Sequence, residues 1–342
     1  MPELCGTKPL LTIAIPTYNR ASELAEMLEV LLPQLAAHPE VDLFVSDNCS
    51  PDGTEGVVQG LAERGLRVRY LRQAENIGSD RNFVACYENA IGSFFWLCGD
   101  DDIILPGTLD RVVDHLGGPL PVDLMYVTSY GFREDWVRER TDDPLQRLVH
   151  TFTDARRLAR VVNIMFTFIS AIIVNRDRLK EIPHEEPSAL LGTNLIQLGW
   201  CLPLLLEHRR SVVIWQRSVA GRQGNAGGYA IGKVFGLGLT QSLARLLPGR
   251  PELQRAIVHP TIRRWLPSAL YAIRAENNDK LGLSTAEADL VKAYGGNIRY
   301  WLFAYPVLRL PLVAARLWFK LGTAFNMAIY MVTVPGFWKK QS

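Results

Sequence analysis

The stretch WLCGDDDIILPG, residues 96–107, places three consecutive aspartates directly behind an apolar run. The run at 94–98 predicts a short buried strand, because its side chains are aromatic or apolar throughout. Asp100, Asp101 and Asp102 therefore follow the carboxyl end of a strand. In open α/β sheets ligands bind beyond this end. One short stretch thus predicts both a sheet and the edge at which a site is expected.

The preceding sequence alternates between strand and helix patterns. Apolar or β-branched runs predict three strands, and amphipathic patterns with polar starts predict three helices. The strands are expected at 10–15, 41–46 and 68–71, and the helices from Ser22, Thr54 and Arg81. This order predicts an α/β fold, with a mostly parallel sheet and helices on both faces. Asn19 and Asp47 then lie at the same edge as the three aspartates.

The middle of the chain is less regular. Further strands are expected at 124–128, 170–174 and 212–215, and a helix at 193–206. The glycine-rich segment 222–238 predicts a mobile loop, and the pattern beyond residue 239 is helical. We therefore expect an α/β domain over residues 1–235 and a helical region over 236–342.

The C-terminal region is basic and aromatic. From residue 290 onward the chain has seven Lys or Arg and no Asp or Glu, so the net charge of +2 leaves −5 for the rest. Aromatic residues stand near these cations at 300–303, 318–319 and 337–338. The uncharged stretch 322–338 is short for a spanning helix. The pattern favours helices that lie on a membrane surface. A spanning helix and an ordinary helical subdomain are the alternatives.

Composition and missing motifs argue against several other classes of protein. The five cysteines are odd in number and form no CxxC pair, which argues against a disulfide framework or a zinc site. Reduced thiols, and a start without a signal-peptide pattern, predict a cytoplasmic location. The sequence has no Walker motif, no GxGxxG after a strand and no HExxH. Its paired arginines are too sparse for a nucleic-acid-binding face.

The three aspartates indicate a particular chemistry. Adjacent carboxylates at a strand end repel one another unless a cation accompanies them. Mg²⁺ and Mn²⁺ prefer carboxylate oxygens and share them with substrate phosphates. Asp100, Asp101 and Asp102 therefore predict a metal–diphosphate site. A solvated acidic turn is the alternative.

Other polar residues fall at the same predicted edge. Asp47 ends the second strand, where its carboxylate can accept hydrogen bonds from a base or a ribose. Asn76, Gly78, Asp80 and Asn82 form a compact polar turn before a helix, whose N-terminal amides suit an anion. The alternative is an ordinary capped turn.

Four motifs, taken in order, resemble family 2 glycosyltransferases with the GT-A fold. They are IPTYNR at 15–20, SDNCSPDGT at 46–54, NIGSDRNF at 76–83 and WLCGDDDIILPG at 96–107. The resemblance covers about residues 10–110, and FISAIIVNR at 168–176 continues it. The forms NxGxDxN and GDDD resemble most the abequosyltransferase-like branch, which acts in bacterial O-antigen assembly.

The resemblance implies roles for the residues of these motifs. Pro16, Tyr18 and Asn19 would line the nucleotide pocket, and Asp47 would hold the base. Asp80 would face the sugar or phosphate side of the nucleotide. Asn76, Gly78 and Asn82, from the same turn, complete the expected nucleotide-sugar site.

The acidic motif departs from the family at one position. Aligned on DDIILPG, Gly99 stands where the family's usual DxD has its first Asp, which makes Asp101 the second. We therefore expect Asp101 to bind Mg²⁺ or Mn²⁺ directly, with Asp102 in support. Asp100 is assigned to the nucleotide-sugar side, and its role is open.

Candidates for the catalytic base lie later in the chain. Glu185 and Glu186 precede the helix expected from Thr193, and either carboxylate can deprotonate an acceptor hydroxyl. Solvated loop charges are the alternative. Arg222, in the glycine-rich segment, is a candidate to close over the diphosphate, and an ordinary surface arginine is its alternative.

These expectations combine into one functional hypothesis. We expect a metal-dependent, inverting glycosyltransferase that moves a sugar from a nucleoside-diphosphate sugar to a hydroxyl. The expected acceptor is a glycan on a polyprenyl-diphosphate lipid at the cytoplasmic face of the inner membrane, in bacterial lipopolysaccharide or related polysaccharide assembly. A catalytically silent membrane scaffold is one alternative. The other is a sugar-phosphate nucleotidyltransferase, which would need a glycine-rich phosphate loop where 16–20 reads PTYNR.

Overall fold

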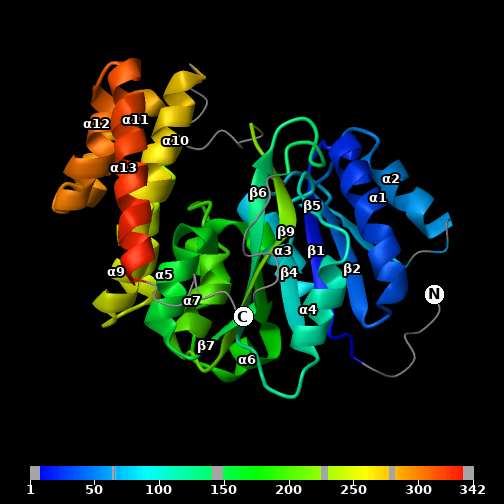
Figure 1. Cartoon of the computed structure of the whole chain (residues 1–342). Coiled ribbons are helices and arrows are strands. Elements are labelled where there is room, and N and C mark those ends of the chain that lie inside the picture. Colours follow the sequence, from blue (N-terminus) through cyan, green and yellow to red (C-terminus); the bar gives the residue numbers. More distant parts are fainter. Residues whose placement is uncertain are drawn as a thin grey trace, which may run out of the picture. The chain divides into compact units, whose positions relative to one another are not determined.

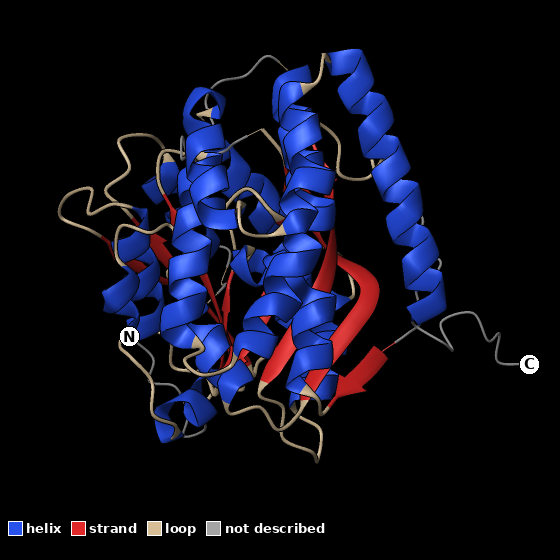
Figure 2. Ribbon diagram, turned by 90° about the vertical axis from the view of Figure 1, so that its left-hand side faces the viewer, coloured by secondary structure: helices blue, strands red, loops and turns tan. Residues whose placement is uncertain are grey.

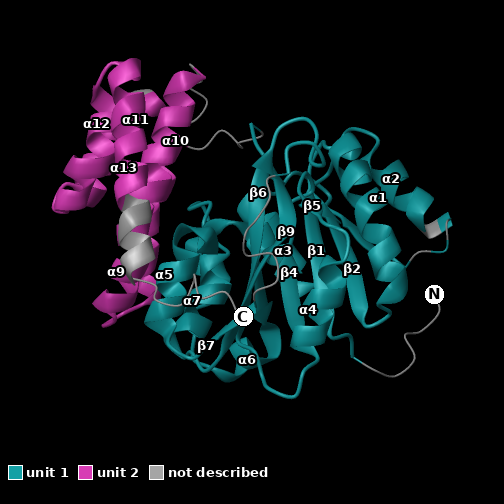
Figure 3. Ribbon diagram, viewed as in Figure 1, with its two compact units in different colours: residues 1–225 teal, residues 226–342 magenta. Residues whose placement is uncertain are grey.

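The computed structural model describes residues 8–63, 65, 67–140, 149–224, 230–276 and 282–333. The chain divides into two compact units, Met1–Asn225 and Ala226–Ser342 (Figure 3). The sheet belongs to the first unit, and the second consists of helices and their connections over its described residues. The observed division thus falls ten residues before the one expected after residue 235. Cys5 and the aromatic pair at 337–338 fall outside the described residues.

The parallel half of the sheet is built around β1 (Leu11–Thr17), as Figure 1 shows. β2 and β4 both run parallel to β1, and β3 runs parallel to β2. Each predicted strand and helix of this half is present and begins within two residues of its expected start. The elements after β1 are α1 (Ala21–Ala37), β2 (Val41–Asp47), α2 (Thr54–Glu63), β3 (Arg69–Arg72), α3 (Ser79–Glu88) and β4 (Phe94–Leu97).

The other half of the sheet is mixed. The strand order is β3-β2-β1-β4-β8-β6-β9-β5, with β7 beside β9. β8 is antiparallel to both β4 and β6, while β6 and β9 are parallel. The elements here are β5 (Ile103–Ile104), α4 (Thr108–Leu116), β6 (Leu124–Phe132), β7 (Val149–Phe152), α5 (Ala155–Val162), β8 (Ile172–Asn175), α6 (Arg176–Glu181), α7 (Leu198–Leu206) and β9 (Ser211–Arg222).

Helices cover both faces of the sheet, as the side-chain alternation of β4 shows. Phe94 and Trp96 belong to the core that α1 covers. Phe95 points to the opposite face, where its ring meets Tyr87 of α3 and Trp200 of α7, each at 5.3 Å. A strand buried on both sides has to be apolar throughout. The predicted α/β fold with helices on both faces is therefore confirmed, with an antiparallel part added to the sheet.

Three local expectations are wrong. The polar start expected at Ser22 is not the helix cap: α1 begins at Ala21, whose backbone N–H donates to Asp52. The helix expected from Thr193 begins only at Leu198, because Asn194 adopts a φ of 57°. The segment expected as a loop over 222–238 is helical from Ile231 onward.

The second unit packs its helices around a core of its own. Its described elements are η4 (Lys233–Gly238), α8 (Leu239–Leu246), α9 (Pro251–Pro260), η5 (Thr261–Trp265), α10 (Leu266–Ala275), α11 (Leu283–Tyr294), η7 (Tyr300–Ala304), α12 (Tyr305–Arg309) and α13 (Leu312–Thr333). Figure 2 shows α13 as a long straight helix before the C-terminal label. Within the described residues, no helix combines the length and the apolar character needed to cross a bilayer.

Gly92 lies in the connection between α3 and β4, and it tests how closely this connection approaches β1. A Cβ at this position would lie 2.5 Å from the backbone nitrogen of Thr12. We expect Gly92→Ala to lower the free energy of unfolding by about 2–3 kcal/mol, because backbone must move. Urea unfolding followed by tryptophan fluorescence measures this change. Gly60→Ala is the control: it meets open space in α2 and should stabilise by up to about 1 kcal/mol. Equal midpoints for the two variants would contradict the described packing.

Candidate active site

The site lies where β1, β2 and β4 end at one edge of the sheet. β1 ends at Thr17, and Asn19 then turns the chain with a φ of 55°. The backbone N–H of Asn19 donates to Ser50 Oγ at 2.9 Å, which ties the first motif to the loop after β2. Tyr18 is 44% exposed beside this turn. Tyr18 is thus accessible from solvent, and its place in the nucleotide pocket stays a prediction.

Asp47 is fully buried at the end of β2. One of its oxygens accepts the backbone N–H of Ser50 at 2.8 Å, and the other accepts the hydroxyl of Tyr70 at 2.7 Å. Arg72 on β3 brings its Nε within 3.6 Å. These contacts hold the carboxylate at the edge of the sheet, where a base or ribose would have to exchange with them.

The turn before α3 is built by side-chain amides. Asn76 Oδ1 accepts Asn48 Nδ2 and the backbone N–H of Gly78, at 2.8 and 2.9 Å. Gly78 has a φ of 82°, which glycine tolerates without strain. Asn82 is buried and bonds both the hydroxyl and the carbonyl of Ser46. Asn76 and Asn82 therefore shape the expected nucleotide site by holding its backbone.

Asp80 connects this turn to the segment that precedes α7. Its Oδ2 accepts the backbone N–H groups of Gly192 and Asn194, at 2.7 and 3.2 Å. Burial raises the pKa of Asp80 against the lowering effect of these bonds. The carboxylate thus fixes the position of 192–194, which explains why the helix begins later than expected.

The acidic motif meets an arginine from the first motif. Arg20 Nη1 donates to Asp100 Oδ1 and to Asp101 Oδ2, both at 2.9 Å. The Asp100 side chain is 6% exposed and that of Asp101 is 13% exposed. Burial raises the pKa of Asp100 to about 6, even though the Arg20 cation lowers it. Local sequence patterns assign no role to Arg20, because its contact with Asp100 spans eighty residues.

Asp102 is held from the other side of the site. Ser170, just before β8, donates its hydroxyl to Asp102 Oδ2 and accepts the backbone N–H of Gly99 at 2.8 Å. The backbone N–H of Arg222 donates to Asp102 Oδ1 at 3.0 Å. Burial, with the neighbouring Asp101, raises the pKa of Asp102 to about 7. Sequence reasoning missed Ser170, although it lies inside the quoted motif FISAIIVNR.

The remaining candidates lie at the margins. The guanidinium of Arg222 lies over the Phe132 ring, 4.6 Å from its centroid, and pairs with Glu26. With the side chain placed there, the backbone N–H of Arg222 contacts the acidic motif, at Asp102. Glu185 and Glu186 are exposed and precede a short 3-10 turn, Pro187–Leu190. Their assignment as the base stays a prediction.

The acidic residues fit a divalent cation that is shared with a ligand. Asp100 and Asp101 offer hard oxygen donors already arranged around one cation, the Arg20 guanidinium. Among the described residues, no group of three or more His, Cys, Asp or Glu side chains forms a cage. Mg²⁺ is usually bound through one or two carboxylates together with substrate phosphates. The donor set therefore fits Mg²⁺ or Mn²⁺ bound with a diphosphate, with Asp101 as the more exposed ligand.

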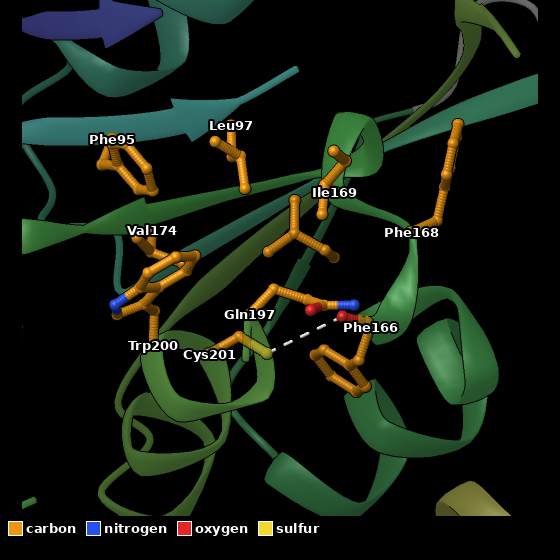
Figure 4. Close-up of a pocket in the computed structure, with 10 residues that line it drawn as sticks. Phe95, Leu97, Phe166, Phe168, Ile169, Val174, Gln197, Trp200 and Cys201 are labelled. Carbon is orange, nitrogen blue, oxygen red and sulfur yellow. Dashed lines mark hydrogen bonds between the residues drawn. The ribbon is translucent and has the colours of Figure 1, made fainter. Parts of the chain in front are cut away.

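A small apolar cavity lies on the α7 face of β4 (Figure 4). Its lining includes Phe95, Phe166, Trp200 and Cys201. Gln197 enters it with its amide and donates to the Thr167 carbonyl at 2.6 Å. The carboxylates of the site do not line this cavity. We therefore assign it to the packing between α7 and the sheet.

The sequence profile of glycosyl transferase family 2 matches residues 12–182, half of the chain. The chain belongs to this family. The matched range contains the strand ends and the acidic motif described above. The family and the glycosyltransferase class expected from the motifs are therefore confirmed, and a nucleotidyltransferase is set aside.

Two curated relatives show how far the similarity extends. Abequosyltransferase RfbV of Salmonella typhimurium is 28% identical over 196 residues, which cover 54% of this chain and 58% of that protein. The GalNAc(5)-diNAcBac-PP-undecaprenol beta-1,3-glucosyltransferase of Campylobacter jejuni is 31% identical over 106 residues, covering 31% of this chain and 34% of that protein. The chain thus spans less than two thirds of either relative's length.

The chain also resembles solved structures in its fold. The crystal structure of S. aureus TarS 1–349 superposes with a TM-score of 0.56 at 15% identity, covering 93% of this chain and 92% of that one. The same protein in complex with UDP-GlcNAc gives a TM-score of 0.55 at 18% identity, with the same coverage. This likeness confirms the expected GT-A fold.

The raised pKa of Asp102 predicts a pH dependence of stability. The folded state binds this proton more tightly than the unfolded chain, so the contribution is full below pH 4 and is lost as the pH rises to about 7. Asp102→Asn removes the charge, so its melting temperature should fall less than the wild type's between pH 4 and pH 7.5. We expect a difference of at least about 2 °C by differential scanning calorimetry. Parallel pH profiles for the two proteins would show that Asp102 is not a buried proton-binding group.

Proposed function

We propose that this family 2 member transfers a sugar from a nucleoside-diphosphate sugar to a hydroxyl of a lipid-linked glycan, in bacterial surface polysaccharide assembly. The observation that carries the donor part is that Asp47 and Asp100–Asp102 stand at the carboxyl ends of β2 and β4, the two parallel neighbours of β1, while Asp80 lies in the first turn of α3. The acceptor part rests on the relatives, one of which is named for a PP-undecaprenol substrate. The abequosyltransferase relative agrees with the branch that the motifs resemble, for which O-antigen or related glycans are the expected products.

The residues divide the reaction between them. The base and ribose would lie against Asp47 and Tyr18, and the diphosphate beside Asp101 at the N-terminal end of α1. A bound Mg²⁺ or Mn²⁺ would neutralise charge on the diphosphate as it leaves. Asp101 would bind that ion, and Asp102 would keep Asp101 and Gly99 in place through Ser170. Asp80 would hold the 192–194 segment beside the donor.

The transfer itself needs a base on the acceptor side. The acceptor oxygen forms a bond to the anomeric carbon, and the bond from that carbon to the diphosphate oxygen breaks. The hydroxyl proton passes to Glu185 or Glu186, whose exposed carboxylates are the candidates for a general base. Displacement in one step inverts the anomeric configuration. A catalytically silent scaffold would share the fold but would bind no donor.

Donor binding can be tested by thermal shift with UDP, CDP, GDP and dTDP, each with and without Mn²⁺. A ligand that binds only the folded state raises the melting temperature by mass action. We expect one nucleotide to stabilise the protein when Mn²⁺ is present, and Asp101→Asn to abolish that effect. Asp101→Asn should also lower the transfer rate at least about 100-fold. If no nucleotide shifts the melting temperature under any condition, the scaffold becomes the better explanation.

The second unit carries a surface suited to a membrane. Val313, Leu317, Leu321 and Phe325 recur every four residues along α13, and each is more than half exposed. Trp318 Nε1 donates to the Leu302 carbonyl at 2.9 Å, which joins this stripe to the exposed Trp301 and Leu302 of η7. We call these seven residues the α13 face.

Cations and the absence of acids suit the same face to anionic lipid. Arg316 and Lys320 are exposed on α13, one helical turn apart, and residues 290–342 contain no Asp or Glu. An apolar stripe flanked by basic residues favours binding in the plane of a bilayer surface. We therefore propose peripheral attachment to the cytoplasmic face of the inner membrane, where the lipid-linked acceptor would be found.

Vesicle flotation tests this attachment with the full chain. We expect binding to phosphatidylglycerol vesicles that weakens as salt is raised, because part of the attraction is electrostatic. Leu317→Asp with Leu321→Asp should lower the bound fraction at least about tenfold, since two exposed leucines that would enter the bilayer are replaced by charges. Leu120→Asp is the matched control, because Leu120 is a similarly exposed leucine of the first unit. Equal loss in the control, or undiminished binding of the double variant, would refute the α13 face as the contact.

A further inference from the structure

Arg20 bridges two carboxylates with a single nitrogen. Its Nη1 donates to Asp100 and to Asp101 at the same distance, 2.9 Å. The arginine is the N-cap residue of α1, directly after the IPTYN stretch. Its side chain is 32% exposed, whereas the two carboxylates are almost buried. The cation therefore covers the acidic motif from the solvent side.

This arrangement uses the oxygens that a divalent cation would need. Asp101 Oδ2 accepts from Arg20, and Asp101 is also the expected metal ligand. A guanidinium and a metal ion on one carboxylate repel each other, and the repulsion is strong where water is partly excluded. Charge-assisted bonds of this kind are about twice as strong as neutral ones. Metal binding at Asp101 thus has to weaken or displace the Arg20 contact.

We propose that Arg20 is an exchangeable counter-ion of the donor site. In the donor-free protein it neutralises Asp100 and Asp101 and holds them in place. When a diphosphate and a divalent cation enter, Asp101 passes to the cation and Arg20 turns to the diphosphate oxygens. This role rests on the proposed function, and it makes Arg20 a positioning residue for the acidic motif as well as a ligand contact.

The exchange has a signature that a purely structural residue lacks. Removal of Arg20 takes away a competitor and a repelling charge, so the protein should bind the metal alone more tightly. The same change takes away a cation for phosphate, so the protein should bind a diphosphate alone more weakly. A residue that merely supported the fold would weaken both ligands together when it is lost.

The experiment measures each ligand by itself, at pH 8 and with the full chain. Binding of Mn²⁺ alone is followed by electron paramagnetic resonance of the free ion, and binding of inorganic pyrophosphate alone by calorimetry. Arg20→Gln should bind Mn²⁺ about tenfold more tightly and pyrophosphate about tenfold more weakly than the wild type. Arg20→Lys keeps the charge but not the planar guanidinium, so its affinities should lie between those of the wild type and of Arg20→Gln.

Arg69→Gln is the matched control. Arg69 is 34% exposed and pairs with Asp42, away from the acidic motif, so its loss should leave both affinities unchanged. Circular dichroism checks that every variant is folded. If Arg20→Gln does not fold, the affinities of Arg20→Lys for the two ligands decide the test. Unchanged or weaker Mn²⁺ binding in the Arg20 variants would overturn the exchange, as would unchanged pyrophosphate binding. Failure of the proposed function would appear separately, as a wild type that no nucleoside diphosphate stabilises.

Discussion

The site depends on where the hydrogen-bonded pairing of β1 with β4 stops. Pairing runs from Leu11 opposite Phe94 to Ala14 opposite Leu97, and the last bond is from the Cys98 N–H to the Ala14 carbonyl. Pro16 follows on β1 and has no N–H to continue the ladder on that side. The chain is therefore released from the sheet just after Leu97, and the four residues GDDD turn across the end of β1. On the other side β1 and β2 remain paired as far as Thr17 and Asp47.

This ending brings negative charge into a poorly hydrated place. Asp100 and Asp102 are almost fully buried, and each has a pKa well above its usual value because of burial. Three kinds of contact compensate: the Arg20 cation, the Ser170 hydroxyl and the backbone N–H of Arg222. They come from three distant parts of the chain. The acidic motif thus links three parts of the first unit. A shift of its carboxylates would disturb the contacts with Arg20 after β1, with Ser170 before β8 and with Arg222 at the end of β9.

Sequence patterns were sufficient for the half of the fold in which each contact is local. Buried parallel strands are apolar throughout, and the helices between them carry one apolar face, so β1 to β4 could be predicted almost to the residue. In the later half the prediction fails, because the structure there depends on long-range contacts that no local sequence pattern encodes. Asp80 takes the amides of Gly192 and Asn194 out of any helix, and Arg20 reaches Asp100 across the sheet edge. The family motifs nevertheless marked Asp47, Asp80 and the three aspartates, because those residues directly follow strands or begin a helix.

Gly99, which stands at the place of the family's usual first aspartate, lies close to two carboxylates of the acidic motif. A Cβ on Gly99 would lie 3.0 Å from Asp102 Oδ2 and 3.1 Å from Asp101 Oδ1, closer than side chains normally approach. The same residue donates its N–H to Ser170, whose hydroxyl binds Asp102. A side chain at position 99 would therefore make the Asp101 and Asp102 carboxylates shift away from the turn. Without a side chain at position 99, the Asp102 carboxylate can lie close over the turn, where it also contacts Ser170 before β8 and the backbone of Arg222 at the end of β9.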